Sequence, residues 1–180
     1  MEIVKQTKKA VNKIAKALKA GKIVVCPTDT VYGFLADAQN KKAVDKIFKL
    51  KQRPRSKPLP VFIEDIKMAK ELAEISKEQE LILKKYWPGK YTFILRAKNK
   101  TIALRVPKHK FLNDLLKKIN KPLAQTSVNI SGQPALNNIK EITEQFGAKV
   151  DLIIDGGNLP QKKPSKIIDL TAGNGQVLRY

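Results

Sequence analysis

Residues 23–36, which read IVVCPTDTVYGFLA, decide the fold. Two apolar runs, 23–26 and 31–36, are rich in β-branched and aromatic side chains, a composition typical of strands. Between them Pro27 ends the first run, and the Thr-Asp-Thr segment 28–30 has the small polar residues of a turn. The stretch predicts two successive strands whose connecting turn either gathers polar groups around a small ligand or simply caps itself.

Working outward, the apolar spacing predicts further helices and strands on both sides of this stretch. Helices are expected at 43–50, 68–72, 77–86, 111–119 and 139–146, and one through Val11, Ile14 and Leu18 that Thr7 caps and Gly21 ends. Strands are expected at 59–63, 91–96, 102–106, 152–154, 167–170 and 177–178, with 98–100 as a hairpin turn. No repeat or linker interrupts this order. We therefore expect a single domain over residues 1–180, an α/β fold with a mixed sheet.

The composition excludes several protein classes. The chain has 180 residues, of which 42% are hydrophobic and 29% charged, as in a folded globular domain. One cysteine makes no intramolecular disulfide, and no apolar run reaches the roughly 18 to 20 residues that span a bilayer. The N-terminus lacks the layout of a signal peptide. We therefore expect a cytoplasmic protein without membrane contact, with Cys26 in its core.

The charge is strongly positive, with 36 Lys and Arg against 16 Asp and Glu. The lysines are spread along the chain, which is typical of either a solvated surface or a groove for nucleotide, phosphate or RNA. Lys51, Arg53, Arg55 and Lys57 alternate along a proline-flanked segment. In an extended segment this spacing would turn four cations to one side, where they would suit a triphosphate. The alternative is an exposed basic loop.

Other candidates are polar side chains near strand ends. Arg105 ends a predicted strand, and segment 127–132 (SVNISG) offers uncharged hydrogen-bonding groups that suit a base, a ribose or an amino acid. His109, the one histidine, is expected at the surface or at a ligand. No Walker loop, Gly-rich dinucleotide motif or metal-ligand spacing is present, so no protein-built metal site is expected.

Seven elements in fixed order resemble the YrdC-type threonylcarbamoyl-AMP synthases over nearly the whole chain. They are PTDTVYG at 27–33, KQRP at 51–54, KPL at 57–59, RVP at 105–107, SVNISG at 127–132, Ser165 and Arg179. The resemblance implies a twisted sheet, flanked by helices, around a basic cleft. It also implies a nucleotidyltransferase that converts L-threonine, bicarbonate or CO2, and ATP into threonylcarbamoyl-AMP and pyrophosphate. A separate transferase complex then modifies the adenosine beside the tRNA anticodon.

The resemblance also implies residue roles. Threonine or its carbamate would contact Thr30, Arg105, Ser127 and Ser165. ATP would contact Arg53, Lys57, Thr101, Asn129, Asn137 and Arg179. Lys51 and Arg53 are the catalytic candidates, since they would neutralise the triphosphate, and Mg²⁺ would be carried in with ATP. Asp29 is the nearest carboxylate for a general base, but turn capping is the favoured role.

Four departures from the family pattern are visible. Phe62 stands where some relatives have histidine, Val128 replaces an alanine, and Lys166 replaces a threonine. The sequence stops one residue after Arg179, so the second domain of longer relatives is not expected.

Two rival functions remain open. One is a non-catalytic module of the same fold that binds double-stranded RNA or tRNA. The net charge of +20 favours this function. The lack of aromatic residues interleaved with basic ones disfavours it, because such residues form the stacking platforms of RNA-binding surfaces. The other is a carbamoyl-transfer domain like that of hydrogenase maturation proteins, which sits in longer chains with zinc-type motifs.

Overall fold

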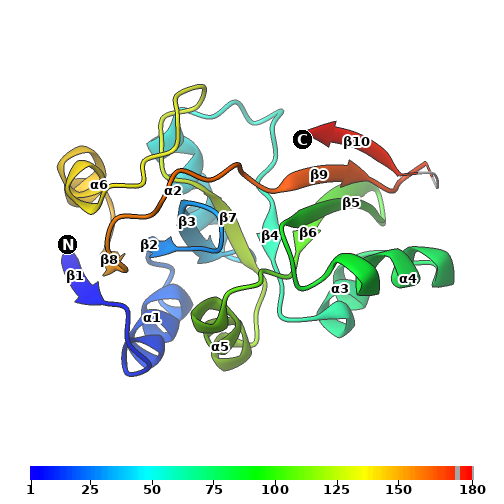
Figure 1. Cartoon of the computed structure of the whole chain (residues 1–180), viewed down its shortest axis with the longest axis horizontal. Coiled ribbons are helices and arrows are strands. Elements are labelled where there is room, and N and C mark those ends of the chain that lie inside the picture. Colours follow the sequence, from blue (N-terminus) through cyan, green and yellow to red (C-terminus); the bar gives the residue numbers. More distant parts are fainter. Residues whose placement is uncertain (173–174, 180) are drawn as a thin grey trace.

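The computed structural model describes residues 1–172 and 175–179, with the backbone alone for Arg179, and the ten strands found there form one sheet (Figure 1). The strands are β1 (Glu2–Lys5), β2 (Val24–Pro27), β3 (Tyr32–Asp37), β4 (Val61–Phe62), β5 (Tyr91–Ala97), β6 (Lys100–Arg105), β7 (Leu123–Ser127), β8 (Leu152–Asp155), β9 (Lys166–Asp169) and β10 (Gln176–Arg179). The helices are α1 (Ala10–Lys19), α2 (Lys41–Lys51), α3 (Ile66–Leu72), α4 (Lys77–Tyr86), α5 (Lys110–Ile119) and α6 (Ile139–Phe146), followed by a 3₁₀ turn at Gly147–Lys149.

The sheet is mixed, as predicted. Its strand order is β1-β8-β2-β3-β7-β4-β6-β5-β9-β10. Parallel pairs such as β2–β8 and β5–β9 stand beside antiparallel pairs such as β2–β3 and β5–β6. Strand directions change markedly between β8 and β9, so the sheet is twisted (Figure 1). The deciding stretch forms the antiparallel pair β2–β3, in which Val24 lies opposite Leu35 and Pro27 opposite Tyr32.

Helices cover both faces of the sheet because successive strand residues point to opposite sides. Val24, Cys26 and Leu35 pack with α1 and α5 in one core cluster. Val25 and Phe34 pack on the other face with α2 and α6, where the Phe34 and Phe146 rings meet edge to face with centroids 5.1 Å apart. The central strands are therefore buried on both faces, and this explains their continuous apolar sequence.

A third core cluster lies under α3 and α4. There Phe93 and Leu104, which face each other across the β5–β6 hairpin, pack with Leu83 and Trp87. The Trp87 and Phe93 ring centroids are 5.5 Å apart. This cluster fixes the segment between α4 and β5, which forms one wall of the pocket described below.

Most predicted elements are confirmed, and α4 and α6 have the predicted bounds. Two strands are additional. β7 reads LAQTS, for which the sequence predicts no strand, yet it lies between β3 and β4, where its backbone is paired on both sides. β1 is an exposed edge strand without apolar alternation. The prediction that Thr7 caps α1 is wrong: Lys9 precedes the helix without a side-chain cap, and the Thr7 carbonyl accepts from the Ala10 amide.

Cys26 is fully buried in β2, and burial raises the pKa of its thiol far above the ordinary range. We expect the native protein to resist thiol reagents and to react only after unfolding. Titration with a chromogenic disulfide reagent, with and without denaturant, checks this. Rapid modification of the native protein would contradict the burial of Cys26.

Candidate functional site

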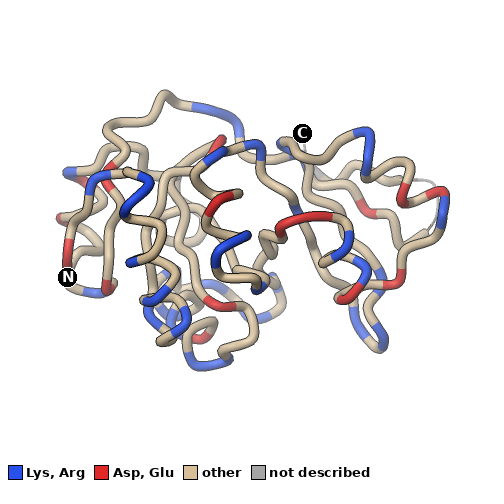
Figure 2. The backbone as a smooth tube through the Cα atoms, turned by 90° about the horizontal axis from the view of Figure 1, so that it is seen from below, with Lys and Arg blue, Asp and Glu red and all other residues tan. Residues whose placement is uncertain are grey.

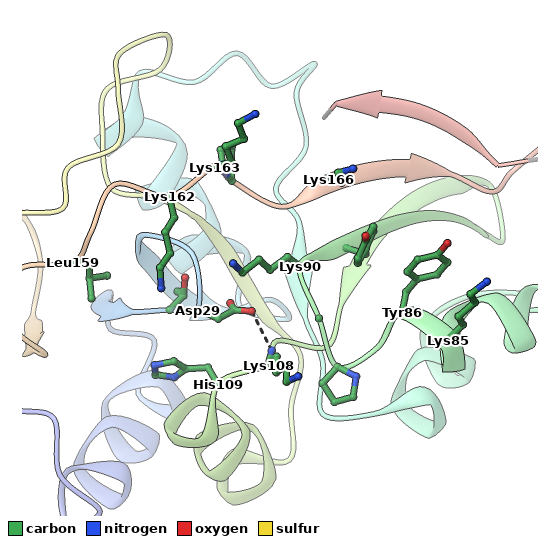
Figure 3. A pocket seen from close by; sticks show the side chains of 15 residues that line it. Asp29, Lys85, Tyr86, Lys90, Lys108, His109, Leu159, Lys162, Lys163 and Lys166 are labelled. Carbon is green, nitrogen blue, oxygen red and sulfur yellow. Dashed lines mark hydrogen bonds between the residues drawn. The ribbon is translucent and has the colours of Figure 1, made fainter.

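A hollow of about 880 Å³ lies among segments that connect the strands and helices (Figure 3). Four segments line it: the turn after β2, the chain from the end of α4 into β5, the residues before α5, and the loop that leads into β9. Six lining residues are lysines, namely Lys85, Lys90, Lys108, Lys162, Lys163 and Lys166. Asp29 is the one carboxylate among the lining residues. Such a pocket attracts anionic ligands.

Elsewhere the basic residues are distributed over the molecule (Figure 2). Lys and Arg positions occur along both halves of the backbone, with fewer acidic positions among them. The diffuse distribution noted in the sequence is therefore real, but the pocket concentrates six of these lysines around one space. Sequence reasoning missed most of this set because its members come from segments up to 81 positions apart, between Lys85 and Lys166.

The turn between β2 and β3 is organised by Thr28. Its hydroxyl accepts from the Thr30 and Val31 amides at 3.0 and 3.2 Å and donates to the Val31 carbonyl at 2.7 Å. The Thr28 and Thr30 hydroxyl oxygens lie 3.0 Å apart, and both residues are buried. Thr28 thus fixes the turn and leaves the Asp29 side chain to project into the pocket (Figure 3).

Asp29 forms a buried ion pair with Arg105. The Arg105 Nη2 donates to both carboxylate oxygens at 2.6 Å, and its Nε donates to the Gly89 carbonyl at 2.9 Å. The Lys108 amide donates to Asp29 Oδ2 at 3.2 Å (Figure 3). The side chains of Asp29 and Arg105 are only 7% and 3% exposed. The favoured prediction for Asp29, turn capping, is therefore wrong, since Thr28 caps the turn and Asp29 pairs with a strand-end arginine.

Arg105 also lies over the Phe62 ring, with its guanidinium carbon 5.5 Å from the ring centroid. Phe62, which replaces the histidine of some relatives, is fully buried in the core below α5. The second departure, Val128, is likewise buried, and its amide donates to the Tyr32 carbonyl. The third, Lys166, lines the pocket.

Lys51 joins two other predicted site residues, Ser127 and Asn129, into one network. Its Nζ donates to the Ser127 carbonyl at 2.6 Å and to the carbonyl and Oδ1 of Asn129 at 3.0 and 2.6 Å. The Ser127 hydroxyl donates to the same Asn129 Oδ1 at 2.7 Å. Burial, and then the charge of Arg53, lower the pKa of Lys51 to about 8, so the ammonium form prevails at neutral pH. The network ties the end of α2 to the end of β7.

The four alternating cations do not share one side, so that prediction is wrong. Lys51 is still helical, and Gln52 adopts a left-handed φ of 50° that reverses the chain. Arg53 then turns back on its own loop and donates to the Lys57 and Pro58 carbonyls at 2.7 and 3.1 Å. Arg55 pairs with Asp45 instead and lies over the Phe48 ring of α2.

The remaining predicted residues are more dispersed. Ser165 is buried beside the pocket, and its hydroxyl lies 2.9 Å from that of Thr92. Thr101 lines a separate hollow of about 460 Å³, together with Arg55. Asn137 has a buried Oδ1 that finds no hydrogen-bond partner among the described residues. The side chain of Arg179 lies outside the described part of the chain.

His109 is half-buried at the start of α5 and lines the pocket. Its Nδ1 accepts from the Leu112 amide at 3.4 Å, which makes it the N-cap of the helix. Burial lowers its pKa, so the imidazole is neutral at pH 7 and free to act as an acceptor. His109 is therefore not a plain surface residue: it caps α5 and lines the pocket.

The structure is thus an α/β protein with a twisted mixed sheet and a lysine-lined pocket whose charge would attract small anionic ligands. A family model described as "Telomere recombination" and named Sua5_yciO_yrdC matches residues 16–180. The chain belongs to this Sua5/YciO/YrdC family.

Curated relatives share its sequence over most of its length. The threonylcarbamoyl-AMP synthase of Pyrococcus abyssi is 36% identical over 173 residues, which are 90% of this chain and 51% of that protein. The threonylcarbamoyl-AMP synthase of Vibrio vulnificus is 32% identical over 179 residues, 92% of this chain and 95% of that protein. The chain thus spans about half of the archaeal relative and nearly all of the bacterial one.

Solved structures agree with these relatives. P. abyssi Sua5 in complex with L-threonine superimposes with a TM-score of 0.91 at 33% identity, over 99% of this chain and 57% of that one. E. coli YciO superimposes with a TM-score of 0.89 at 27% identity, over 99% of this chain and 92% of that one. The shared architecture therefore extends over the whole sheet.

Proposed function

We propose that this protein is a threonylcarbamoyl-AMP synthase, which forms threonylcarbamoyl-AMP and pyrophosphate from L-threonine, bicarbonate or CO2, and ATP. The observation that carries the proposal is the network of Lys51, Ser127 and Asn129. These residues come from two of the motifs that resemble the synthases, and the fold brings them into direct contact. The synthase names of the curated relatives and the lysine-lined pocket support the same activity.

The chemistry suits a site that works by positioning and charge. The threonine amine attacks CO2, loses a proton and becomes a carbamate. A carbamate oxygen then displaces pyrophosphate at the α-phosphorus of ATP, in line with the departing oxygen. Both reactants of the second step are anionic, so they repel each other. Arg53 and the pocket lysines would offset that repulsion, while Lys51 holds the two motifs in register.

Mg²⁺ would enter with ATP, held by phosphate oxygens and water. Within residues 1–172 and 175–179, no three His, Cys, Asp or Glu side chains gather closely enough to hold a metal ion. The described side chains therefore do not form a metal cage of their own, and no step above depends on one.

The proposed product is reactive, so a threonylcarbamoyl transferase complex that modifies tRNA would have to accept it. The positive charge would favour contact with tRNA as well. We place this work in the cytoplasm, where ATP and bicarbonate are at hand. No helix of the described residues is long and apolar enough to cross a membrane.

Release of pyrophosphate tests the proposal. The protein is incubated with ATP, Mg²⁺, L-threonine and bicarbonate, with each omitted in turn and with serine replacing threonine. We expect release that requires both threonine and bicarbonate. Absence of release from folded protein that still binds tRNA in a salt-dependent way would favour the RNA-binding module instead, and use of carbamoyl phosphate would favour the carbamoyl-transfer domain.

Arg53 and Arg55 form a matched pair for testing the ATP site. Arg53→Ala is expected to raise the KM for ATP at least about tenfold, because a charge-assisted contact to phosphate is lost. Arg55→Ala is expected to change it less than about threefold, since Arg55 is engaged with Asp45 and Phe48. Pyrophosphate release at varied ATP checks both. Equal effects of the two variants would remove Arg53 from the site.

A further inference from the structure

The turn that follows β8 is held by a tyrosine of β3. The Tyr32 hydroxyl donates to the Gly157 carbonyl at 2.6 Å and accepts from the Gly156 amide at 3.1 Å. Tyr32 is fully buried, so its side chain reaches these two glycines from inside the core. Asp155 adds a third bond, since its Oδ1 accepts from the Gly157 amide at 2.9 Å. The turn is therefore tied to the middle of the sheet.

The two glycines fit this turn closely. A Cβ on Gly156 would lie 2.6 Å from Gln6 Oε1 and 2.8 Å from Pro27 Cγ, and Gly157 has a left-handed φ of 77°. Both glycines are exposed, so water can satisfy their backbone groups when the Tyr32 hydroxyl is absent. Loss of the hydroxyl should therefore release the turn at little cost in stability.

The residues directly after the glycines hold the segment that precedes α6. The Leu159 amide donates to the Asn137 carbonyl at 3.0 Å, and Asn158 Oδ1 accepts from the Ile139 amide at 3.2 Å. Leu159 and Ile139 also pack against the core cluster that contains Tyr32. A short series of contacts thus leads from the Tyr32 hydroxyl to the Asn137 backbone.

Asn137 is the residue of this segment that the family resemblance assigns to ATP. Its Oδ1 is buried and has no hydrogen-bond partner among the described residues. Because no hydrogen bond holds that oxygen, its position depends on the backbone around it. On one side the backbone is fixed by the Leu136 amide, which donates to the Val128 carbonyl at 2.9 Å. On the other side it is fixed by the contacts of Asn158 and Leu159.

We propose that Tyr32 is a positioning residue for ATP: its hydroxyl fixes the turn after β8, and that turn holds Asn137 at the nucleotide. The inference rests on the proposed function for the identity of ATP as the substrate. It extends that function to a buried residue that acts through Asn137. Because burial raises the pKa of the Tyr32 phenol, the hydroxyl keeps its proton at neutral pH and remains a donor.

A double-mutant cycle on the KM for ATP tests the proposal. Tyr32→Phe removes the hydroxyl and keeps the ring, whereas Asn137→Ala removes the side chain that the turn positions. Each variant is expected to raise the KM for ATP about three- to tenfold, the value of one hydrogen bond, and to change kcat and the KM for threonine less than about twofold. The double variant should exceed the larger single effect by less than about twofold, because both changes remove the same contact.

Thr143→Val is the matched control, since it also removes a hydroxyl that donates to a backbone carbonyl. That carbonyl belongs to Ile139, and the bond of 2.8 Å lies within α6. We expect its KM for ATP to change less than about twofold. The thermal midpoint of Tyr32→Phe should fall by less than about 4 °C, so that the change in KM is not a result of unfolding.

Several results would overturn the inference while the wild-type protein still releases pyrophosphate from ATP. They are an unchanged KM for ATP in Tyr32→Phe or in Asn137→Ala, an equal rise in the KM for threonine, and single effects that multiply in the double variant. If Tyr32→Phe does not fold, Asn158→Ala breaks the next contact at an exposed residue, and an unchanged KM for ATP there would also overturn it. Folded wild-type protein that releases no pyrophosphate would instead refute the proposed function, and the inference with it.

Discussion

Replacement of Arg105 by methionine is expected to lower the free energy of unfolding by about 3 to 5 kcal/mol. The physical reason is the charge left behind: Asp29 is 7% exposed and would keep a buried carboxylate without its ion-pair partner. The Lys108 amide would remain as a donor to that carboxylate, but one neutral donor does not replace a guanidinium. Urea denaturation, followed by circular dichroism, measures the loss.

The double variant Asp29→Ala, Arg105→Met isolates the pair itself. With both charges removed, we expect the stability to recover to within about 2 kcal/mol of the wild type, since an apolar replacement of a buried pair is often nearly neutral. Arg96→Met, at an exposed arginine of β5, should cost less than about 1 kcal/mol. If the double variant loses as much stability as Asp29→Ala and Arg105→Met lose together, the described pairing is contradicted.

Replacement of Lys51 by methionine is expected to reduce threonine- and ATP-dependent pyrophosphate release by at least about 100-fold. Methionine has a similar length but donates nothing, so the Ser127 carbonyl and both Asn129 oxygens lose their shared donor. The segment after β7 would then shift relative to Arg53, and a displacement of about 1 Å at a catalytic site can cost about 100-fold. Steady-state kinetics measures the effect.

Lys49→Met is the matched control, because Lys49 is exposed on the same helix. We expect less than about a twofold change in its turnover. The thermal midpoint of Lys51→Met should fall as well, since the part-buried Ser127 carbonyl and the two buried Asn129 oxygens lose a charged donor. Full activity in Lys51→Met would show that the network does not serve the reaction.

The sequence predicted the fold well where local and tertiary preferences agree. The amphipathic helix α4 begins where it was predicted because Ser76 and Gln79 form a capping box, a local interaction that does not depend on the rest of the fold. The sequence does not predict β7, because LAQTS has only two apolar residues, Leu123 and Ala124, and no apolar alternation. Its polar Gln125 and Thr126 are buried where β7 pairs with β3 and β4, which is a tertiary effect.

The sequence indicated which residues belong to the site, but it did not indicate how most of them contact one another. The resemblance singled out Lys51 and Asn129 without their contact, which joins positions 78 apart. The alternation of Lys51, Arg53 and Arg55 suggested one cationic side, but the left-handed Gln52 rotates the chain and separates them. The pairing of Asp29 with Arg105 spans 76 positions and no local pattern signals it. Such long-range contacts depend on sheet order, which short motifs do not encode.

The most direct test of the proposed activity follows carbon from bicarbonate into the product. The protein is incubated with ATP, Mg²⁺, L-threonine and ¹³C-bicarbonate, and the mixture is analysed at once by mass spectrometry. The proposal predicts an ion of threonylcarbamoyl-AMP that carries one ¹³C atom, formed together with pyrophosphate. Threonyl-AMP without the label, or no adenylated threonine at all from folded protein, would contradict the account.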